Sequence, residues 1–154
     1  MRIRSILDTD IAAVAALMRA LSDEFIVHES SAEAGARFHR ENDANAILAF
    51  FRAGTAYYVA EIDGAIAGFI AIRDNKHIFH MFVDKAHHRQ GIARELWAAA
   101  RQAALEAGNP GEFTVNASNY ALSAYEAMGF VRMAPTQYKN GIYYNPMKLG
   151  GVTP

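Results

Sequence analysis

Apolar residues recur along the chain with two spacings, and these predict alternating strands and helices. Residues 2 to 7 alternate as a short strand. From Ile11 to Phe25 apolar side chains recur at steps of three and four residues, which places them on one face of a helix. Thr9 or Asp10 can cap the start of that helix.

A second helical region and a hairpin follow. The sequence SSAE at residues 30–33 resembles a capping box and predicts a helical region that extends to Phe51, with a break near Asn42 to Asn45. Two β-rich runs come next, joined by Asp63-Gly64, a dipeptide that tolerates the positive φ angles of a tight hairpin. Residues 77–84 predict a third strand of this group.

The last third of the chain alternates again. A helix is expected from near Gly91 to the turn at residues 108–110. The remaining predicted elements are a strand at 112–117, a helix at 119–128 and a closing strand pair at 130–139 and 142–149. This order predicts an α/β sandwich built on a mixed sheet.

Composition narrows the class of protein. A chain of 154 residues with 52% hydrophobic and 20% charged residues predicts one packed domain. A net charge of -1 gives no field to hold a polyanion, so no nucleic-acid partner is expected. The chain has no cysteine and no apolar stretch of about 20 residues, and we expect no signal peptide, since Asp8 and Asp10 interrupt the first apolar run. We therefore expect a cytoplasmic protein with no membrane partner.

The stretch HHRQGIARELW, which begins at His87, is the strongest chemical signal. A strand leads into a helix that starts near Gly91, and the free backbone N–H groups of a helix start favour an anion such as a pyrophosphate. Arg89 and Arg94 can add positive charge to the same site. The adjacent histidines lack cysteine or carboxylate partners at ligand spacing, so no metal is expected.

Two motifs resemble the GNAT superfamily of acetyl-CoA-dependent N-acetyltransferases. HRQGIA at residues 88–93 is similar to the motif Q/R-x-x-G-x-G/A, and VNASNYALSAYEAMGFV at 115–131 is similar to a later motif with a tyrosine and a closing Gly-Phe. The resemblance implies an α/β (α+β) fold in residues 1–149, with a mixed, mostly antiparallel sheet flanked by helices on both faces, and a short tail at 150–154. His88 departs from the motif, and we expect a modest loss of phosphate affinity.

The resemblance also implies a reaction and its cofactor residues. An amine would attack the thioester of acetyl-CoA directly in a ternary complex. A backbone N–H near Met81 or Phe82 would polarise the thioester carbonyl. Tyr125 would act as the acid for the leaving thiolate. The expected cofactor-binding residues are Phe82, Val83, His88, Arg89, Gln90, Gly91, Ile92, Ala93, Arg94, Asn116, Ser118 and Tyr125.

The general base and the acceptor are less determined. His80 interrupts an apolar strand near the expected acceptor nitrogen and is the first candidate for the base. Glu24 and His28 are candidates for the acceptor side. Six tyrosines could form an aromatic pocket there: Tyr57, Tyr58, Tyr120, Tyr138, Tyr143 and Tyr144. The acceptor amine, of a small molecule, a peptide or a protein, stays open.

Two other functions fit parts of the pattern. A non-catalytic module of the same fold could bind acyl-CoA as a sensor, which the departure at His88 allows. An unrelated α/β protein could bind an anion at the helix start, but this leaves the second motif unexplained. A homodimer is also left open.

Overall fold

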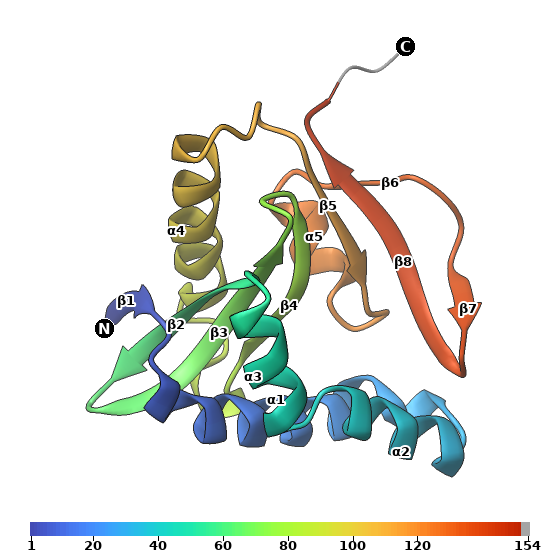
Figure 1. Ribbon diagram of the computed structural model, residues 1–154. Helices are drawn as coiled ribbons and strands as arrows, with labels where there is room; N and C mark the ends of the chain where they lie inside the picture. Colours follow the sequence, from blue (N-terminus) through green and yellow to red (C-terminus); the bar gives the residue numbers. More distant parts are fainter. Residues whose placement is uncertain (152–154) are drawn as a thin grey trace.

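The computed structural model describes residues 1–151 and shows strands and helices in the expected order (Figure 1). The predicted tail at 150–154 therefore lies mostly outside the described residues. None of the helices in the described part of the chain has the length and apolarity that a membrane span needs. The elements are β1 (Arg2–Ser5), α1 (Ile11–Phe25), α2 (Ala32–Glu41), α3 (Ala44–Arg52), β2 (Ala56–Ile62), β3 (Ala65–Arg73), β4 (His77–Val83), α4 (Ile92–Glu106), β5 (Phe113–Ala117), α5 (Leu122–Ala127), β6 (Val131–Arg132), β7 (Gln137–Lys139) and β8 (Ile142–Leu149).

The strands form one sheet in the order β1-β2-β3-β4-β5-β8-β6, and β7 pairs with β8. Among the described strands β4 and β5 are the parallel pair, and the other pairings are antiparallel. The predicted mixed, mostly antiparallel sheet is confirmed.

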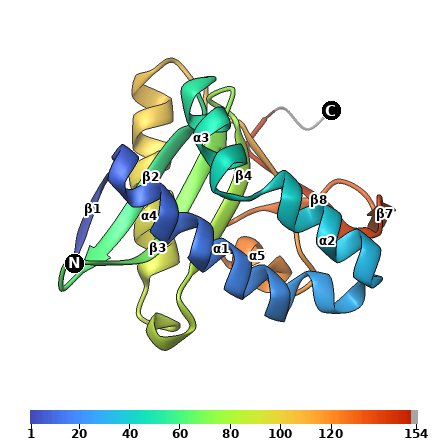
Figure 2. The same cartoon turned by 60° about the horizontal axis from the view of Figure 1, so that its bottom comes forward.

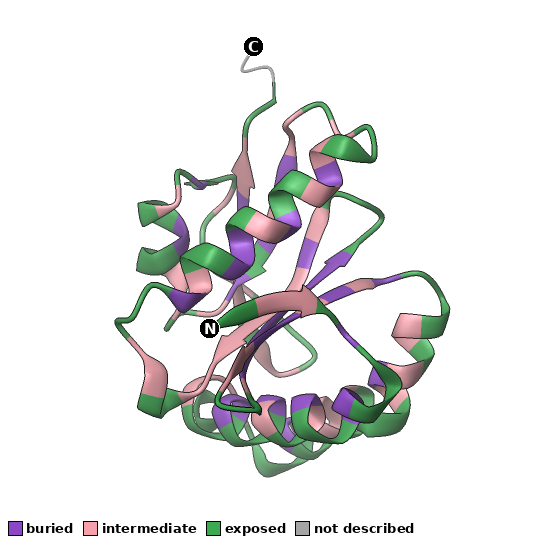
Figure 3. Ribbon diagram, turned by 90° about the vertical axis from the view of Figure 1, so that its left-hand side faces the viewer, coloured by how far each residue is buried: buried purple, intermediate pink, exposed green. Residues whose placement is uncertain are grey.

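Helices cover both faces of the sheet, as expected. In Figure 2, α1 and α3 lie in front of the sheet and α4 lies behind it. Alternate residues of the central strand β3 are buried on opposite faces: Phe69 and Ala71 pack in the cluster under α1 and α3, and Ile70 and Ile72 pack under α4. Figure 3 shows the helices turning their buried residues to the sheet and their exposed residues outward.

The start of α1 differs from the prediction. Asp10 precedes α1, but its side chain does not cap that helix. Its carboxylate accepts hydrogen bonds from the Leu7 N–H (2.7 Å) and from Arg4 Nη1 (2.7 Å). Asp10 therefore closes the short 3-10 turn at Asp8–Asp10 and ties it to β1. The bond from Arg4 lowers the pKa of Asp10, since it stabilises the carboxylate.

The second helical region and the hairpin are confirmed. The helical region breaks between α2 and α3 at Asn42 and Asp43, and Asp43 caps α3. Ser31 caps α2 by accepting from the Ala34 N–H at 3.1 Å, so the predicted box with Glu33 is replaced by a simple N-cap. Asp63 and Gly64 take φ angles of 50° and 80° between β2 and β3, as a tight hairpin requires.

Two elements in the C-terminal third are shorter than predicted. The predicted helix at 119–128 is shorter, because the Ser118 hydroxyl accepts from the Ala121 N–H at 3.1 Å and holds residues 118–121 in a turn before α5. The predicted strand at 130–139 is two short strands, β6 and β7. Pro135 lies between them and cannot donate to a strand ladder.

The strands β4 and β5 separate along their length. They pair only at His77 with Thr114 and at Ile78 with Val115. The register between β3 and β4 then shifts by one residue, which leaves Phe79 as a bulge, and a bulge bends its strand. The separation opens the sheet beyond Ile78.

Candidate functional site

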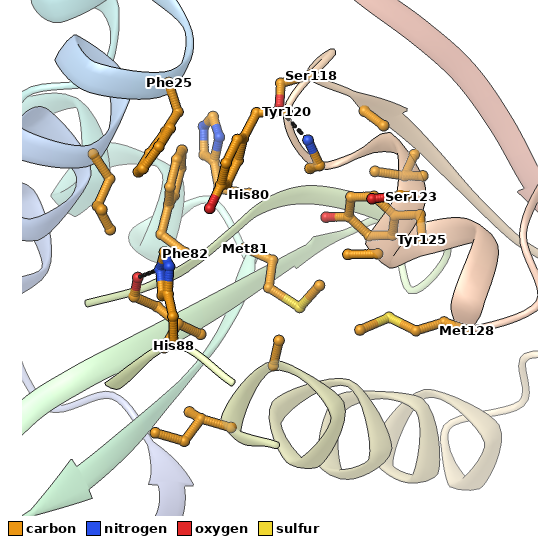
Figure 4. A pocket seen from close by; sticks show the side chains of 18 of the residues that line it. Phe25, His80, Met81, Phe82, His88, Ser118, Tyr120, Ser123, Tyr125 and Met128 are labelled. Carbon is orange, nitrogen blue, oxygen red and sulfur yellow. Dashed lines mark hydrogen bonds between the residues drawn. The ribbon is translucent and has the colours of Figure 1, made fainter. Parts of the chain in front are cut away.

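A cavity of about 590 Å³ opens where β4 and β5 separate. Its walls come from the end of α1, from β4, from the start of α4, and from β5 with α5. Figure 4 shows side chains from these elements pointing into one space. The cavity thus joins both sequence motifs.

The start of α4 lies on one side of this cavity and is a candidate anion cradle, made of its first turn with Arg89 and Arg94. Gly91 precedes the helix with φ 77°, in the left-handed region, and Arg89 has φ 64°. The first bond of the helix runs from the Glu95 N–H to the Gly91 carbonyl (3.1 Å). The N–H groups of the first turn thus have no partner within the helix. Arg89 and Arg94 also line the cavity, so backbone donors and positive charge meet there.

The two adjacent histidines have separate partners. His88 donates from Nε2 to the Val83 carbonyl at 2.7 Å and thereby fixes the turn that follows β4. The Nδ1 atom of His87 lies 3.6 Å from a carboxylate oxygen of Asp84. Within residues 1–151, no three histidine, cysteine, aspartate or glutamate side chains gather in a cluster that could hold a metal ion.

Tyr125 lies on α5 and faces the cavity, with its hydroxyl pointing into the open space (Figure 4). The ring is held edge-on against Phe130, with ring centres 5.5 Å apart. Burial raises the pKa of the Tyr125 phenol well above its ordinary value. The hydroxyl therefore stays protonated at neutral pH and keeps a proton to donate.

His80 lies on β4 and also lines the cavity. The side chain of Asn42 donates from Nδ2 to the Phe38 carbonyl (2.9 Å), which leaves Oδ1 facing Nε2 of His80 at 3.1 Å. The neutral ring therefore carries its hydrogen on Nε2, and Nδ1 keeps a free lone pair. Burial, followed by the charge of Arg73, lowers the pKa of His80 to about 3.

The structure brings most of the other predicted site residues together. Of the predicted cofactor residues besides Tyr125, those in the cavity wall are Phe82, Val83, His88, Arg89, Gly91, Ile92, Ala93, Arg94, Asn116 and Ser118. Gln90, Glu24 and His28 are not in the wall and are exposed. Glu24 accepts instead from Lys85 Nζ at 2.5 Å.

An aromatic contact between distant segments was missed from the sequence. Phe25, at the end of α1, stacks on Tyr120, in the turn before α5, with ring centres 3.9 Å apart. Beside this pair, Asn119 donates from Nδ2 to the carboxylate of Glu29 at 3.1 Å. The only signal in the sequence was the apolar stripe of α1, which continues to Phe25 at its last turn.

Of the six tyrosines considered for an aromatic acceptor pocket, Tyr120 lines the cavity. Tyr57 is buried in the core under α1, where its hydroxyl has no hydrogen-bond partner among residues 1–151. Tyr138 and Tyr143 pack on each other at 4.7 Å on β7 and β8, and both are exposed.

Comparison with known proteins decides the family. Residues 18–150 match the acetyltransferase (GNAT) domain family. The chain belongs to the GNAT family of acetyltransferases. The family suggested by the two motifs is confirmed. The human protein N-acetyltransferase 8 is 33% identical over 89 residues, which are 50% of this GNAT chain and 39% of the human protein. The match thus spans well under half of that relative.

Solved structures share the fold of this GNAT chain. A GCN5-related N-acetyltransferase from Rhodopseudomonas palustris superposes with a TM-score of 0.79 at 23% identity, covering 96% of this chain and 93% of the other. The PaiA N-acetyltransferase from Thermoplasma acidophilum, solved with coenzyme A, has a TM-score of 0.77 at 17% identity, covering 96% of each chain. At these identities the likeness shows the fold.

Proposed function

We propose that this GNAT protein transfers the acetyl group of acetyl-CoA to a primary amine by direct attack in a ternary complex. The observation that supports this best is that the anion cradle of α4, the separated edge of β4 and the hydroxyl of Tyr125 meet in one cavity. The family and the coenzyme A in the solved PaiA structure support the same choice of cofactor.

The residues present fit the parts of this cofactor. The first turn of α4, with Arg89 and Arg94, would hold the pyrophosphate. The backbone of Phe82 and Val83, beyond the last pairing with β5, would hold the pantetheine arm as an added strand, and Asn116 and Ser118 face it from the other side. When bound, acetyl-CoA supplies the acetyl thioester. A backbone N–H near Met81 or Phe82 would polarise its carbonyl.

Two side chains would take part in proton transfer, one as the acid and one as the base. Tyr125 would protonate the leaving sulfur as the carbon–sulfur bond breaks, because its hydroxyl points into the cavity (Figure 4) and is protonated at neutral pH. His80 would accept the proton that the nitrogen loses. A lowered pKa makes the His80 ring a weak acceptor. It can still serve after attack, because nitrogen becomes far more acidic once its bond to carbon forms.

Coenzyme A or acetyl-CoA should stabilise the fold. At about 100 times its dissociation constant, a ligand that binds only the folded protein adds roughly 2.7 kcal/mol to the free energy of unfolding. We expect a thermal shift at millimolar cofactor, followed by thiol release when an accepted amine is added. The absence of any shift would contradict the cofactor assignment. Binding without thiol release from any amine would favour a non-catalytic sensor.

Replacing Asn42 should change the titration of His80. In Asn42→Asp a carboxylate faces Nε2 and stabilises the imidazolium, so the pKa of His80 should rise from about 3 toward its ordinary value near 6.5. The His80 ring signal, followed by NMR between pH 3 and 8, reports this directly. Asn42→Ser adds no charge and serves as the control. A ring that titrates at the same pH in all three proteins would show that Asn42 does not set its protonation.

A further inference from the structure

The acceptor side of the cavity is aromatic. Phe25 and Tyr120 stack at 3.9 Å over it, and Phe82 and His80 approach from β4 with ring centres 6.2 Å apart. Phe79 lies against His80 at 4.1 Å. Figure 4 shows the rings of Phe25, Tyr120, His80 and Phe82 gathered at one end of the cavity, with Tyr125 at the other. These rings present apolar faces to whatever enters beside the thioester site.

No carboxylate lines this cavity among the described residues. Its titratable groups are His80, His87, His88, Arg89, Arg94, Tyr120 and Tyr125. The carboxylates nearby have other partners: Glu24 is bonded to Lys85, Glu29 to Asn119, and Asp84 lies beside His87. An ammonium ion entering the cavity would therefore find no fixed negative charge and would lose its hydration.

The wall also lacks a strong base. Two positive or titratable neighbours, Arg73 and His77, act on His80 in the direction that keeps it neutral, and within residues 1–151 its hydrogen-bond partner is the uncharged Asn42. An alkylammonium ion holds its proton like a lysine, with a pKa near 10.4, whereas an α-amino group has a pKa of about 7.7–8.0. Transfer from the alkylammonium ion to such a ring is strongly uphill, so the amine must arrive already neutral.

From the rings and the missing carboxylate we infer that the acceptor is a weakly basic primary amine next to an aromatic or large apolar group, and that it enters as the free base. This inference rests on the proposed acetyl transfer. The neutral nitrogen forms its bond to the acetyl carbon as the carbon–sulfur bond breaks. Sulfur takes the proton of Tyr125, and the proton lost by nitrogen returns to the phenol through His80 or water. The products are an N-acetyl amide and the free thiol.

Four amines separate the effect of a weakly basic nitrogen from the effect of an aromatic body. Phenylalaninamide has an α-amino group and an aromatic body, and glycinamide has only the α-amino group. Phenethylamine has the aromatic body on a strongly basic amine, and butylamine has neither property. At pH 7 an amine of pKa about 7.8 has about 300 times more free base than one of pKa about 10.4, and at pH 9.5 about 10 times more. We expect kcat/KM for phenylalaninamide to exceed that for phenethylamine by about these factors.

The aromatic body should also matter by itself. Phenylalaninamide should exceed glycinamide by at least about 10-fold in kcat/KM, since filling an apolar pocket discriminates by that much or more. Tyr120→Ala should reduce this preference. Tyr138→Ala is the matched control, because Tyr138 is exposed on β7 and outside the cavity wall. It should leave the preference unchanged.

The outcomes distinguish this inference from the proposed function. Equal kcat/KM for all four amines, or a preference for butylamine or phenethylamine at pH 7, would overturn the inference and leave acetyl transfer in place. If none of the four is acetylated while another primary amine is, the inference is also wrong. Failure of the proposed function would show as no cofactor-induced shift, or as a shift without thiol release from any amine.

Discussion

Tyr125→Phe should lower kcat by about 100- to 10,000-fold, the usual contribution of a general acid. The change removes the hydroxyl that points into the cavity and keeps the ring with its edge-on contact to Phe130. Folding and cofactor affinity should therefore change little. Steady-state turnover with an accepted amine, together with the cofactor-induced thermal shift, measures both properties in the same protein.

Tyr57→Phe is the matched control for this variant. Tyr57 is also buried with a raised pKa, but it lies in the core under α1, where its hydroxyl has no hydrogen-bond partner in the described part of the chain. Removing that hydroxyl should leave turnover unchanged and should not destabilise the fold. A Tyr125→Phe protein with wild-type turnover would show that the phenol is not the acid. A large loss of stability would instead assign the hydroxyl a structural role.

The order of elements could be predicted because local signals fix it. The stripe of α1, the dipeptide Asp63-Gly64 and the helix start at Gly91 each depend on residues close together in the chain, and each prediction is confirmed. The errors arose where a side chain changed the local outcome. Ser118 holds a turn where a helix was expected, and Asp10 accepts from the Leu7 N–H within a 3-10 turn instead of capping α1.

Much of the site was predictable from the two motifs. Gly91 and Tyr125 belong to the two family motifs, and both line the cavity. The stack of Phe25 on Tyr120 and the bond from His80 to Asn42 join segments 95 and 38 residues apart in the chain. No local pattern encodes such pairs, because they form only when α1 and α2 pack beside the sheet. Their consequences for the acceptor and for the protonation of His80 therefore required the structure.

The anion cradle predicts the second large effect. Gly91→Val should weaken coenzyme A binding by about 100-fold or more, because a β-branched residue disfavours the left-handed conformation that precedes α4. If the turn rearranges, two charge-assisted hydrogen bonds to phosphate are lost. At about 1.5 kcal/mol each, their loss accounts for a decrease in affinity of about 100-fold. The dissociation constant is measured by calorimetry.

A valine substitution at a second glycine is the control that distinguishes loss of the ligand site from the conformational strain of the substitution. Gly64, in the hairpin between β2 and β3, has φ 80° against 77° for Gly91, and an added Cβ meets no other atom within 4 Å at either position. Gly64→Val should therefore carry a similar conformational cost and lower the melting temperature to a similar degree. Its affinity for coenzyme A should stay at the wild-type value, because the hairpin is not part of the cavity wall. If both variants lose affinity equally, the loss reflects general destabilisation; if neither does, the pyrophosphate binds away from the start of α4.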